Sequence, residues 1–156
     1  MDRRIEMEAL KSALYQACLD FIGIRMETAK TALAQAQEAS NDDTKSSAGD
    51  KFETTREMMQ QDIFRNKKLL ADAEQNLNLL LSLEEVPLTE VVKNGSLVVT
   101  TQGIFYISIS AGQLRIGDTV AFAISAASPV GQLMLNKKVG EVFTFNQKEY
   151  KIEAVH

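Results

Sequence analysis

The spacing of apolar residues in the first half of the chain constrains the fold most strongly. Between Met1 and Ser40 there is no proline and only one glycine, Gly23, and strong helix formers dominate. Apolar residues recur there every three or four positions, as they do on one face of an α-helix. They are Leu10, Leu14, Ala17, Phe21 and Ile24, followed more sparsely by Ala29, Leu33 and Ala36. The pattern predicts one long helix.

A second stripe of the same kind follows. It runs through Phe52, Met59, Ile63, Leu70, Ala73, Leu77 and Leu80, and Arg56 and Asn66 interrupt it. Stripes this narrow are typical of a coiled coil. The polar segment SNDDTKSSAG, from Ser40 to Gly49, separates the two stripes. Residues 1–85 are therefore predicted to form an antiparallel coiled-coil hairpin whose tip lies at about residues 40–53.

The composition changes after Pro87. Runs rich in β-branched and aromatic residues alternate with turn signals, which predicts short strands. The runs cover Leu97–Thr100, Ile104–Ser110, Thr119–Ser125, Glu141–Phe145 and Glu149–Val155. A short helix is predicted at Gly131–Leu135. Residues 86–156 are thus predicted to form a second domain, a small antiparallel sheet with one helix, and the chain as a whole is predicted to be α+β.

Charge and residue counts narrow the functional classes. The chain has 21 acidic and 17 basic residues, and the acidic excess lies in residues 1–85, so no broad basic face for duplex nucleic acid is expected. The single cysteine, Cys18, excludes an internal disulfide and is expected to be half-buried on a helix. The single histidine, His156, is expected to fray and to serve poorly as a base or ligand.

No sequence motif of a self-sufficient enzyme is present, so no activity of the chain's own is predicted. No apolar run approaches the roughly 20 residues of a membrane span. The first ten residues are too charged for a signal peptide. We therefore expect a cytoplasmic protein without membrane contact.

Acidic residues gather at the predicted tip. Asp42, Asp43, Asp50 and Glu53 lie within twelve positions. Asp50 and Glu53 are three residues apart, which fits a capping box at the start of a helix. Carboxylates at the end of a stiff rod could also hold a divalent cation and orient a water molecule. The spacing leaves both interpretations open, and no metal site is predicted in the isolated protein.

Two stretches resemble known motifs. The stretch ISAASPVGQLMLNKKVGEVFTF, from Ile124, resembles the signature of the GreA/GreB transcript cleavage factors, in which S-P-[LV]-G precedes a short helix and K-x-V-G-[DE]. The matching residues are Ser128, Pro129, Val130, Gly131, Leu133, Leu135, Lys138, Val139, Gly140 and Glu141. The stretch GDKFET, from Gly49, is similar to the family's tip motif G-D-L-x-E-N. From the residues alone, Ser128–Gly131 are expected to form a turn and a helix start, with Pro129 fixing φ.

The resemblance implies a bacterial transcription elongation factor. It implies an FKBP-like fold for residues 86–156, binding to RNA polymerase, and entry of the coiled coil into the secondary channel. The tip carboxylates Asp50 and Glu53, with Asp42 and Asp43 as the fallback pair, would help the polymerase hold its catalytic Mg²⁺ and cleave backtracked RNA. The polymerase would remain the catalyst, contact with nascent RNA would be indirect, and the protein would be a monomer without a cofactor of its own.

Two alternatives remain open from the sequence. A regulator that enters the secondary channel without supplying metal ligands would use the same architecture. A coiled-coil adaptor unrelated to polymerase would also account for the helical stripes.

Overall fold

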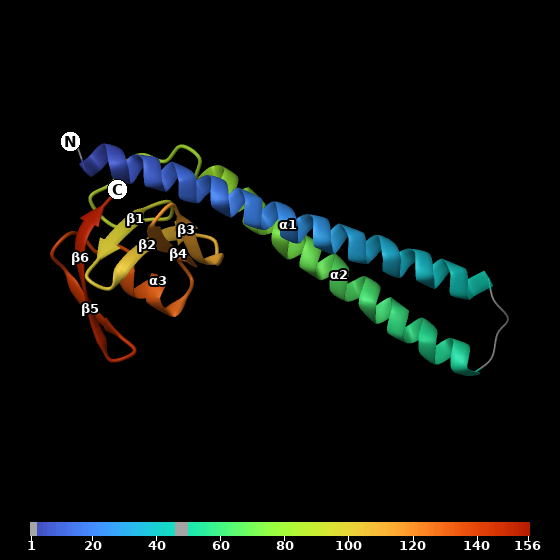
Figure 1. Ribbon diagram of the computed structural model, residues 1–156. Coiled ribbons are helices and arrows are strands. Elements are labelled where there is room, and N and C mark those ends of the chain that lie inside the picture. Colours follow the sequence, from blue (N-terminus) through green and yellow to red (C-terminus); the bar gives the residue numbers. More distant parts are fainter. Residues whose placement is uncertain (1–2, 46–49) are drawn as a thin grey trace. The chain divides into compact units, whose positions relative to one another are not determined.

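The α+β class is confirmed by the computed structural model (Figure 1). It describes the backbone of residues 3–45 and 50–156, and the side chains of all of these except residues 42–45 and 50–53. Two long helices, α1 (Arg3–Lys45) and α2 (Asp50–Ser82), precede six strands and one short helix. The later elements are β1 (Leu97–Thr100), β2 (Gly103–Ser108), β3 (Gly112–Ile116), β4 (Thr119–Ser125), α3 (Pro129–Met134), β5 (Val142–Phe145) and β6 (Lys148–Val155).

Contacts divide the chain into two compact units. The sheet unit comprises residues 1–21 and 78–156, and the helix pair comprises residues 22–77. The two domains predicted from the sequence, residues 1–85 and 86–156, separate the helices from the strands. The division by contacts differs, because the first turns of α1 pack with the sheet. Among the described helices, none combines the length and the apolar character needed to cross a membrane.

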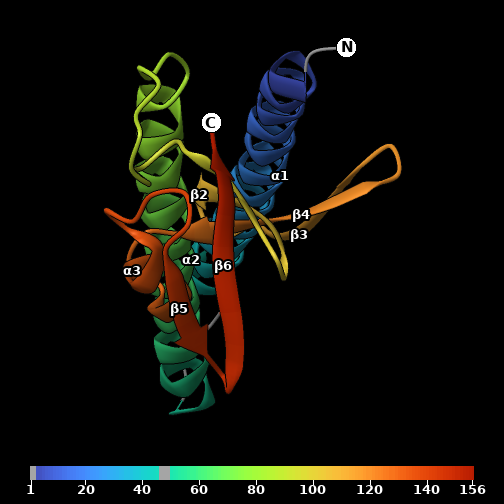
Figure 2. The same ribbon diagram turned by 90° about the vertical axis from the view of Figure 1, so that its left-hand side faces the viewer.

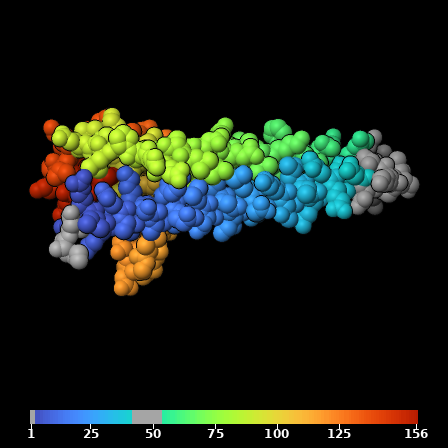
Figure 3. Space-filling view, turned by 90° about the horizontal axis from the view of Figure 1, so that it is seen from above, coloured from blue at the N-terminus to red at the C-terminus, as the bar shows by residue number. Residues whose placement is uncertain are grey.

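The helix pair buries side chains along a single line. Within it the helices run antiparallel, since the Gln60 side chain donates to Ser40 Oγ at 3.5 Å while Ala29 and Ala73 line one groove. Figure 3 shows side chains of α1, in blue and cyan, against those of α2, in green. Buried or half-buried positions along the line are Ile22, Met26, Ala29, Leu33, Ala36 and Ser40 in α1, and Met59, Ile63, Asn66, Leu70, Ala73 and Leu77 in α2.

Two details of the predicted stripes are wrong. Ile24 is 69% exposed, because two residues along a helix rotate the side chain by about 200° away from Ile22. Asn66 was predicted to interrupt the stripe, yet it occupies a half-buried position within it. Its side-chain nitrogen donates to the backbone oxygen of Asp62 at 2.9 Å, which satisfies one of its two N–H groups.

The prediction of an entirely antiparallel sheet is also wrong. The six strands lie in the order β3-β4-β2-β1-β6-β5, and β2 pairs with β4 in parallel, from Ile104 opposite Ala121 to Ser108 opposite Ser125. Every other named pair of strands is antiparallel. The reason is β3, which the sequence analysis missed. Its extra reversal of the chain brings β4 back beside β2 in the same direction.

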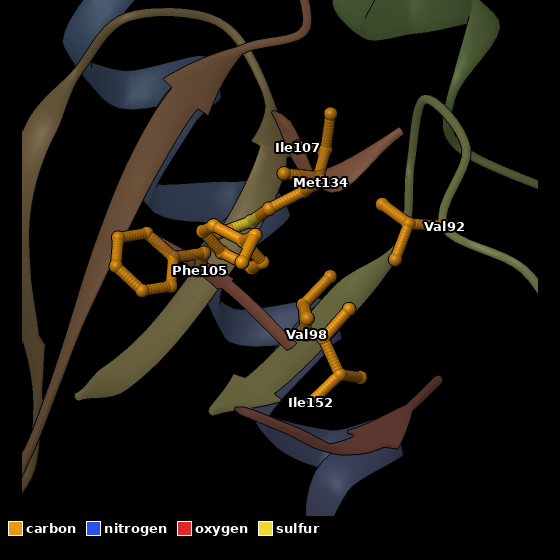
Figure 4. Close-up of a cluster of buried hydrophobic side chains, with 7 residues drawn as sticks. Val92, Val98, Phe105, Ile107, Met134 and Ile152 are labelled. Carbon is orange, nitrogen blue, oxygen red and sulfur yellow. The ribbon is translucent and has the colours of Figure 1, made fainter. Parts of the chain in front are cut away.

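The core of the sheet unit lies on one face of this sheet. A cluster of buried residues fills it, with Met134 contributed by α3 (Figure 4). The cluster comprises Val92, Val98, Phe105, Ile107, Met134, Phe143 and Ile152. Helix α3 contacts β5 (Figure 2), so the face is closed by a helix that begins two residues earlier than predicted.

The opposite face of β2 is covered by the start of α1. Side chains alternate along a strand, so Tyr106 and Ser108 point away from the cluster that holds Phe105 and Ile107. Cys18 Sγ lies 3.8 Å from Ser108 Oγ, and both residues are 0% exposed. Cys18 is therefore fully buried, rather than half-buried as the sequence suggested.

Candidate functional site

The predicted tip residues cannot be placed as a site. The backbone of Asp42 and Asp43 belongs to the last turns of α1, and Asp50 and Glu53 fall in the first turn of α2. The side chains of all four lie outside the described residues, as does Gly49 entirely. Their role stays a prediction.

The signature residues Ser128–Gly131 build the entry into α3, as expected. Ser128 is the N-cap: its hydroxyl oxygen accepts from the Gly131 backbone N–H at 3.1 Å, and the hydroxyl donates to the Ser125 carbonyl at 2.7 Å. Pro129 occupies the first turn, where a missing N–H costs nothing and the fixed φ suits a helix. The turn and helix start are thus confirmed.

Gly131 is required by close packing. A Cβ atom at this position would lie 2.2 Å from the Ser125 carbonyl oxygen and 2.9 Å from Ser128 Oγ. The two hydrogen bonds of Ser128 hold these oxygens in place, so the backbone would have to shift to accept any other residue. The S-P-V-G motif is therefore a compact structural unit.

The second half of the signature forms a turn that is tied to the sheet. The Lys138 backbone N–H donates to Glu141 Oε2 at 2.8 Å, and Gly140 has φ +93°, which favours glycine. The Gly140 N–H donates to the Ile152 carbonyl in β6 at 2.8 Å. This arrangement leaves Val139 57% exposed.

An apolar groove lies beside this turn. The Leu88 groove, about 450 Å³ in volume, is lined by Leu88, Thr89, Glu90, Lys138, Val139 and Val155. Leu88 is 56% exposed. Two further apolar residues of the sheet unit, Leu133 and Val142, are also exposed. Exposed apolar residues of this kind are a common feature of protein-binding surfaces.

A larger cavity lies elsewhere in the sheet unit. The Tyr15 cavity, about 570 Å³ in volume, is bounded by the start of α1, the segment after α2, and two residues of the sheet region. Polar groups on its walls include Lys11, Tyr15, Glu84, Glu85, Tyr106 and His156. None of these residues was a candidate in the sequence analysis.

Lys11 and His156 meet at one side of the cavity. Lys11 Nζ donates to the His156 backbone oxygen at 3.2 Å. Burial lowers the pKa of Lys11, against the opposing effect of Glu8. Burial and, next, the charge of Lys11 lower the pKa of His156. The backbone of His156 exchanges two hydrogen bonds with Leu97, at 2.8 and 2.9 Å, so the expected fraying is wrong.

The Tyr15 hydroxyl is the most unusual group on these walls. It is buried, and no described residue forms a hydrogen bond with it. Burial, and then the negative charge of Glu84, raise its pKa. Burial also raises the pKa of Tyr106 and of the Cys18 thiol. These groups are uncharged at neutral pH, which suits binding by hydrogen bonds better than acid–base chemistry.

The sequence held only a weak signal for this cavity. Lys11 and Tyr15 are four residues apart and each follows a buried leucine, so they lie along one edge of the apolar stripe. Glu84 and Glu85 lie just after the end of α2, where the Leu83 N–H donates to the Leu80 carbonyl, and apolar periodicity gives no signal for residues at such a position.

Comparison with known proteins assigns no family to this chain. A scan against models of protein families finds no match, and a search of curated proteins finds none. Within the described ranges, no group of three or more His, Cys, Asp or Glu side chains is placed to hold a metal ion.

Proposed function

We propose that this protein is a regulator of bacterial RNA polymerase, of the GreA/GreB type, that promotes cleavage of backtracked RNA. One observation carries the proposal. The residues that resemble the family signature have definable structural roles in the strand-rich region of the chain, which follows two long helices in the sequence. Ser128 caps α3, Gly131 permits close packing, and Glu141 closes a turn.

The helices are proposed to form a coiled coil that enters the secondary channel. Covered positions in α2 are spaced alternately by four and three residues, from Met59 to Leu77. This alternation is the heptad pattern that coiled coils use. An FKBP-like fold for residues 86–156, a monomeric state and a cytoplasmic location belong to the same proposal.

The tip carboxylates would act as helpers of the polymerase. Asp50 and Glu53 are three residues apart in α2, and residues at this spacing share a helix face. Carboxylate oxygens are the ligands that Mg²⁺ prefers. They would add ligands to the catalytic Mg²⁺ of the polymerase, which orients the attacking water. The two carboxylates would supply negative charge, and the polymerase would perform the hydrolysis.

The sheet unit is proposed to dock on the outside of the polymerase. The Leu88 groove, with Leu88 and Val139 more than half exposed, supplies an apolar surface for this contact. Lys138 and Glu90, which also line the groove, supply one positive and one negative charge that would orient the polymerase surface. Leu88→Ser should then weaken capture of core polymerase and leave the fold intact, because the side chain is exposed.

RNA release from stalled elongation complexes tests the tip. We expect the double variant Asp50→Asn with Glu53→Gln to retain polymerase binding and to reduce stimulated cleavage by about a hundredfold or more. Removal of a group that supports a metal ion in an active site commonly lowers activity to this extent. The matched control is Glu57→Gln with Glu74→Gln, which removes two exposed charges from the same helix and should cleave like wild type.

The fallback pair and the non-cleaving alternative have distinct outcomes in this assay. If only Asp42→Asn with Asp43→Asn abolishes cleavage, the earlier pair supplies the ligands.

Lys51 and Thr54 stand where the family has leucine and asparagine, which favours a regulator without cleavage as the second candidate. Wild-type protein that binds polymerase but releases no RNA above background would establish that candidate. Failure to capture polymerase would favour an adaptor.

A further inference from the structure

The Tyr15 cavity shares one lining residue, Leu88, with the docking groove proposed above, and its other residues have no role in that function. All of its lining residues belong to the sheet unit. Its volume of about 570 Å³ falls within the range of roughly 300–1,000 Å³ that ligand sites occupy. Five of the twelve lining residues are aliphatic or tyrosine and the other seven are polar or charged, so the cavity suits a charged ligand better than an apolar one.

The charge of the walls favours a cation. Three carboxylates, of Glu8, Glu84 and Glu85, face one ammonium group, that of Lys11. Glu8 forms an ion pair with Arg4 at 3.8 Å and also acts on Lys11, whose ammonium group donates to a backbone oxygen. Among the residues that the structure describes, no ion pair joins Glu84 or Glu85 to a cation. Two carboxylates are therefore available to a cationic ligand.

The Tyr15 hydroxyl has almost no exposed surface, so it becomes a hydrogen-bond acceptor near these carboxylates only when the Tyr15 ring turns toward the cavity that it lines. It is buried and without a hydrogen-bond partner in the described part of the chain. It lies close enough to Glu84 for the carboxylate to influence its ionisation. A ligand with several N–H groups can donate to the hydroxyl oxygen and to a carboxylate at once, which would satisfy both.

The apolar part of the walls suits an aliphatic stem. Leu83 is buried, Val86 is half-buried, and the rings of Tyr15 and Tyr106 complete the lining. An aliphatic stem that ends in a multivalent cation describes an arginine side chain, whose planar guanidinium carries five N–H donors and also stacks on aromatic faces.

We propose that the Tyr15 cavity binds an arginine side chain of a partner protein, with Glu84 and Glu85 pairing with the guanidinium and Tyr15 Oη accepting one of its N–H groups. Lysine fits less well, because its compact ammonium group cannot present parallel donors to a carboxylate and a neighbouring hydroxyl. Leu88 lines both this cavity and the groove proposed to dock on polymerase, but none of the variants below changes Leu88, so the test does not depend on polymerase binding.

The chain provides its own reporters for the test. It has three tyrosines, of which Tyr15 and Tyr106 line the cavity, whereas Tyr150 stacks on Phe143 with ring centroids 5.0 Å apart. In protein labelled with ¹³C at the tyrosine rings, titration with N-acetyl-arginine-N-methylamide should shift the signals of Tyr15 and Tyr106 and leave that of Tyr150 in place. The neutral citrulline analogue should shift none of them.

Two variants test the assigned contacts: Glu84 is exposed and can be changed without disturbing the fold, and phenylalanine keeps the half-buried ring of Tyr15. Glu84→Gln should weaken binding of the arginine probe by about tenfold, the effect of losing one charge-assisted hydrogen bond. Tyr15→Phe, which keeps the ring, should weaken it by several-fold. Glu74→Gln, an exposed glutamate that does not line the cavity, should bind like wild type.

Several outcomes would overturn the proposal. Equal shifts with the citrulline analogue would mean that charge is not recognised, and unchanged affinity in Glu84→Gln would remove the assigned ion pair. Tighter binding of the lysine analogue would contradict the choice of arginine. Tighter binding of agmatine, which has the guanidinium but no peptide groups, would identify a small-molecule site in place of a protein partner.

Discussion

In the helix pair the buried side chains form a line, whereas in the sheet unit they surround a cluster. Among the described residues of the helix pair, Ile22, Ala29, Ser40 and Ala73 are buried, and three of these are small. The sheet unit buries large side chains such as Tyr106, Ile107 and Met134 at 1% exposure or less. A residue of the line therefore removes much less apolar surface from water than a residue of the cluster.

This difference has a consequence for stability and for function. Free energy from apolar burial is roughly proportional to the area removed from water, so the sheet unit should hold its structure more strongly than the helix pair. A line of small contacts is typical of helices that rely on a partner or on their length. That is consistent with the proposal that the helices act inside a larger assembly.

Truncation of one residue in each unit should give the largest contrast. Ile107→Ala should lower the free energy of unfolding of the sheet unit by about 3 kcal/mol, because Ile107 is 0% exposed within the cluster. Leu33→Ala, at a half-buried position of the line, should cost the helix pair only about 1 kcal/mol.

The two units can be followed separately in the same molecule. All three tyrosines lie in the sheet unit, so tyrosine fluorescence follows its unfolding, whereas far-ultraviolet circular dichroism follows mainly the helices, most of whose residues belong to the helix pair. Ile107→Ala is followed by tyrosine fluorescence and Leu33→Ala by circular dichroism. Equal losses of unfolding free energy in the two variants would contradict the contrast between the line and the cluster.

Two glycines should respond in opposite directions to the same substitution. Gly131→Ala places a Cβ 2.2 Å from the Ser125 oxygen and should destabilise the sheet unit by about 2 kcal/mol. Gly23→Ala meets no atom within 4 Å, lies inside α1, and should stabilise the helix by about 0.5–1 kcal/mol. Denaturant titration measures both. Destabilisation by Gly23→Ala would reveal a contact at that position that the described structure lacks.

The helices could be predicted from the sequence because their signal is local. Apolar spacing in residues 10–22 and 59–80 reports directly which side of the helix is covered. The same pattern could not separate Ile22 from Ile24, since both are apolar and only the packing shows which one is buried.

The sheet was predicted less well because its signal depends on distant pairing. Strand β3 carries Gln113 and Arg115 and lies at the edge of the sheet, so it lacks the apolar run that marks a strand. Without it, the parallel pairing of β2 and β4 could not be foreseen. The Tyr15 cavity was missed for a related reason, since residues 11–15, 84–85 and 106 meet only in the folded chain.

The smallest expected effect is a change in the stability of the sheet unit with pH. It distinguishes the two units once more, because the single histidine, His156, lies in the sheet unit. Burial first, and then the charge of Lys11, lower the pKa of His156 below its ordinary value of 6.5, although Glu8 acts in the opposite direction. The unfolded chain therefore binds this proton more readily than the folded chain. Stability that is present above pH 6.5 is then lost as the pH falls through 6.5 toward the folded pKa.

Substitution of His156 isolates this contribution. His156→Gln keeps the backbone hydrogen bonds to Leu97 and cannot be protonated. Between about pH 7.5 and about pH 5.5, the tyrosine-monitored stability of wild type should fall slightly more than that of the variant. The difference is small because the imidazole is only partly buried. An identical pH dependence in both proteins would show that His156 titrates alike in the folded and unfolded chains, and the cavity wall around Lys11 would then be more open to water than the structure indicates.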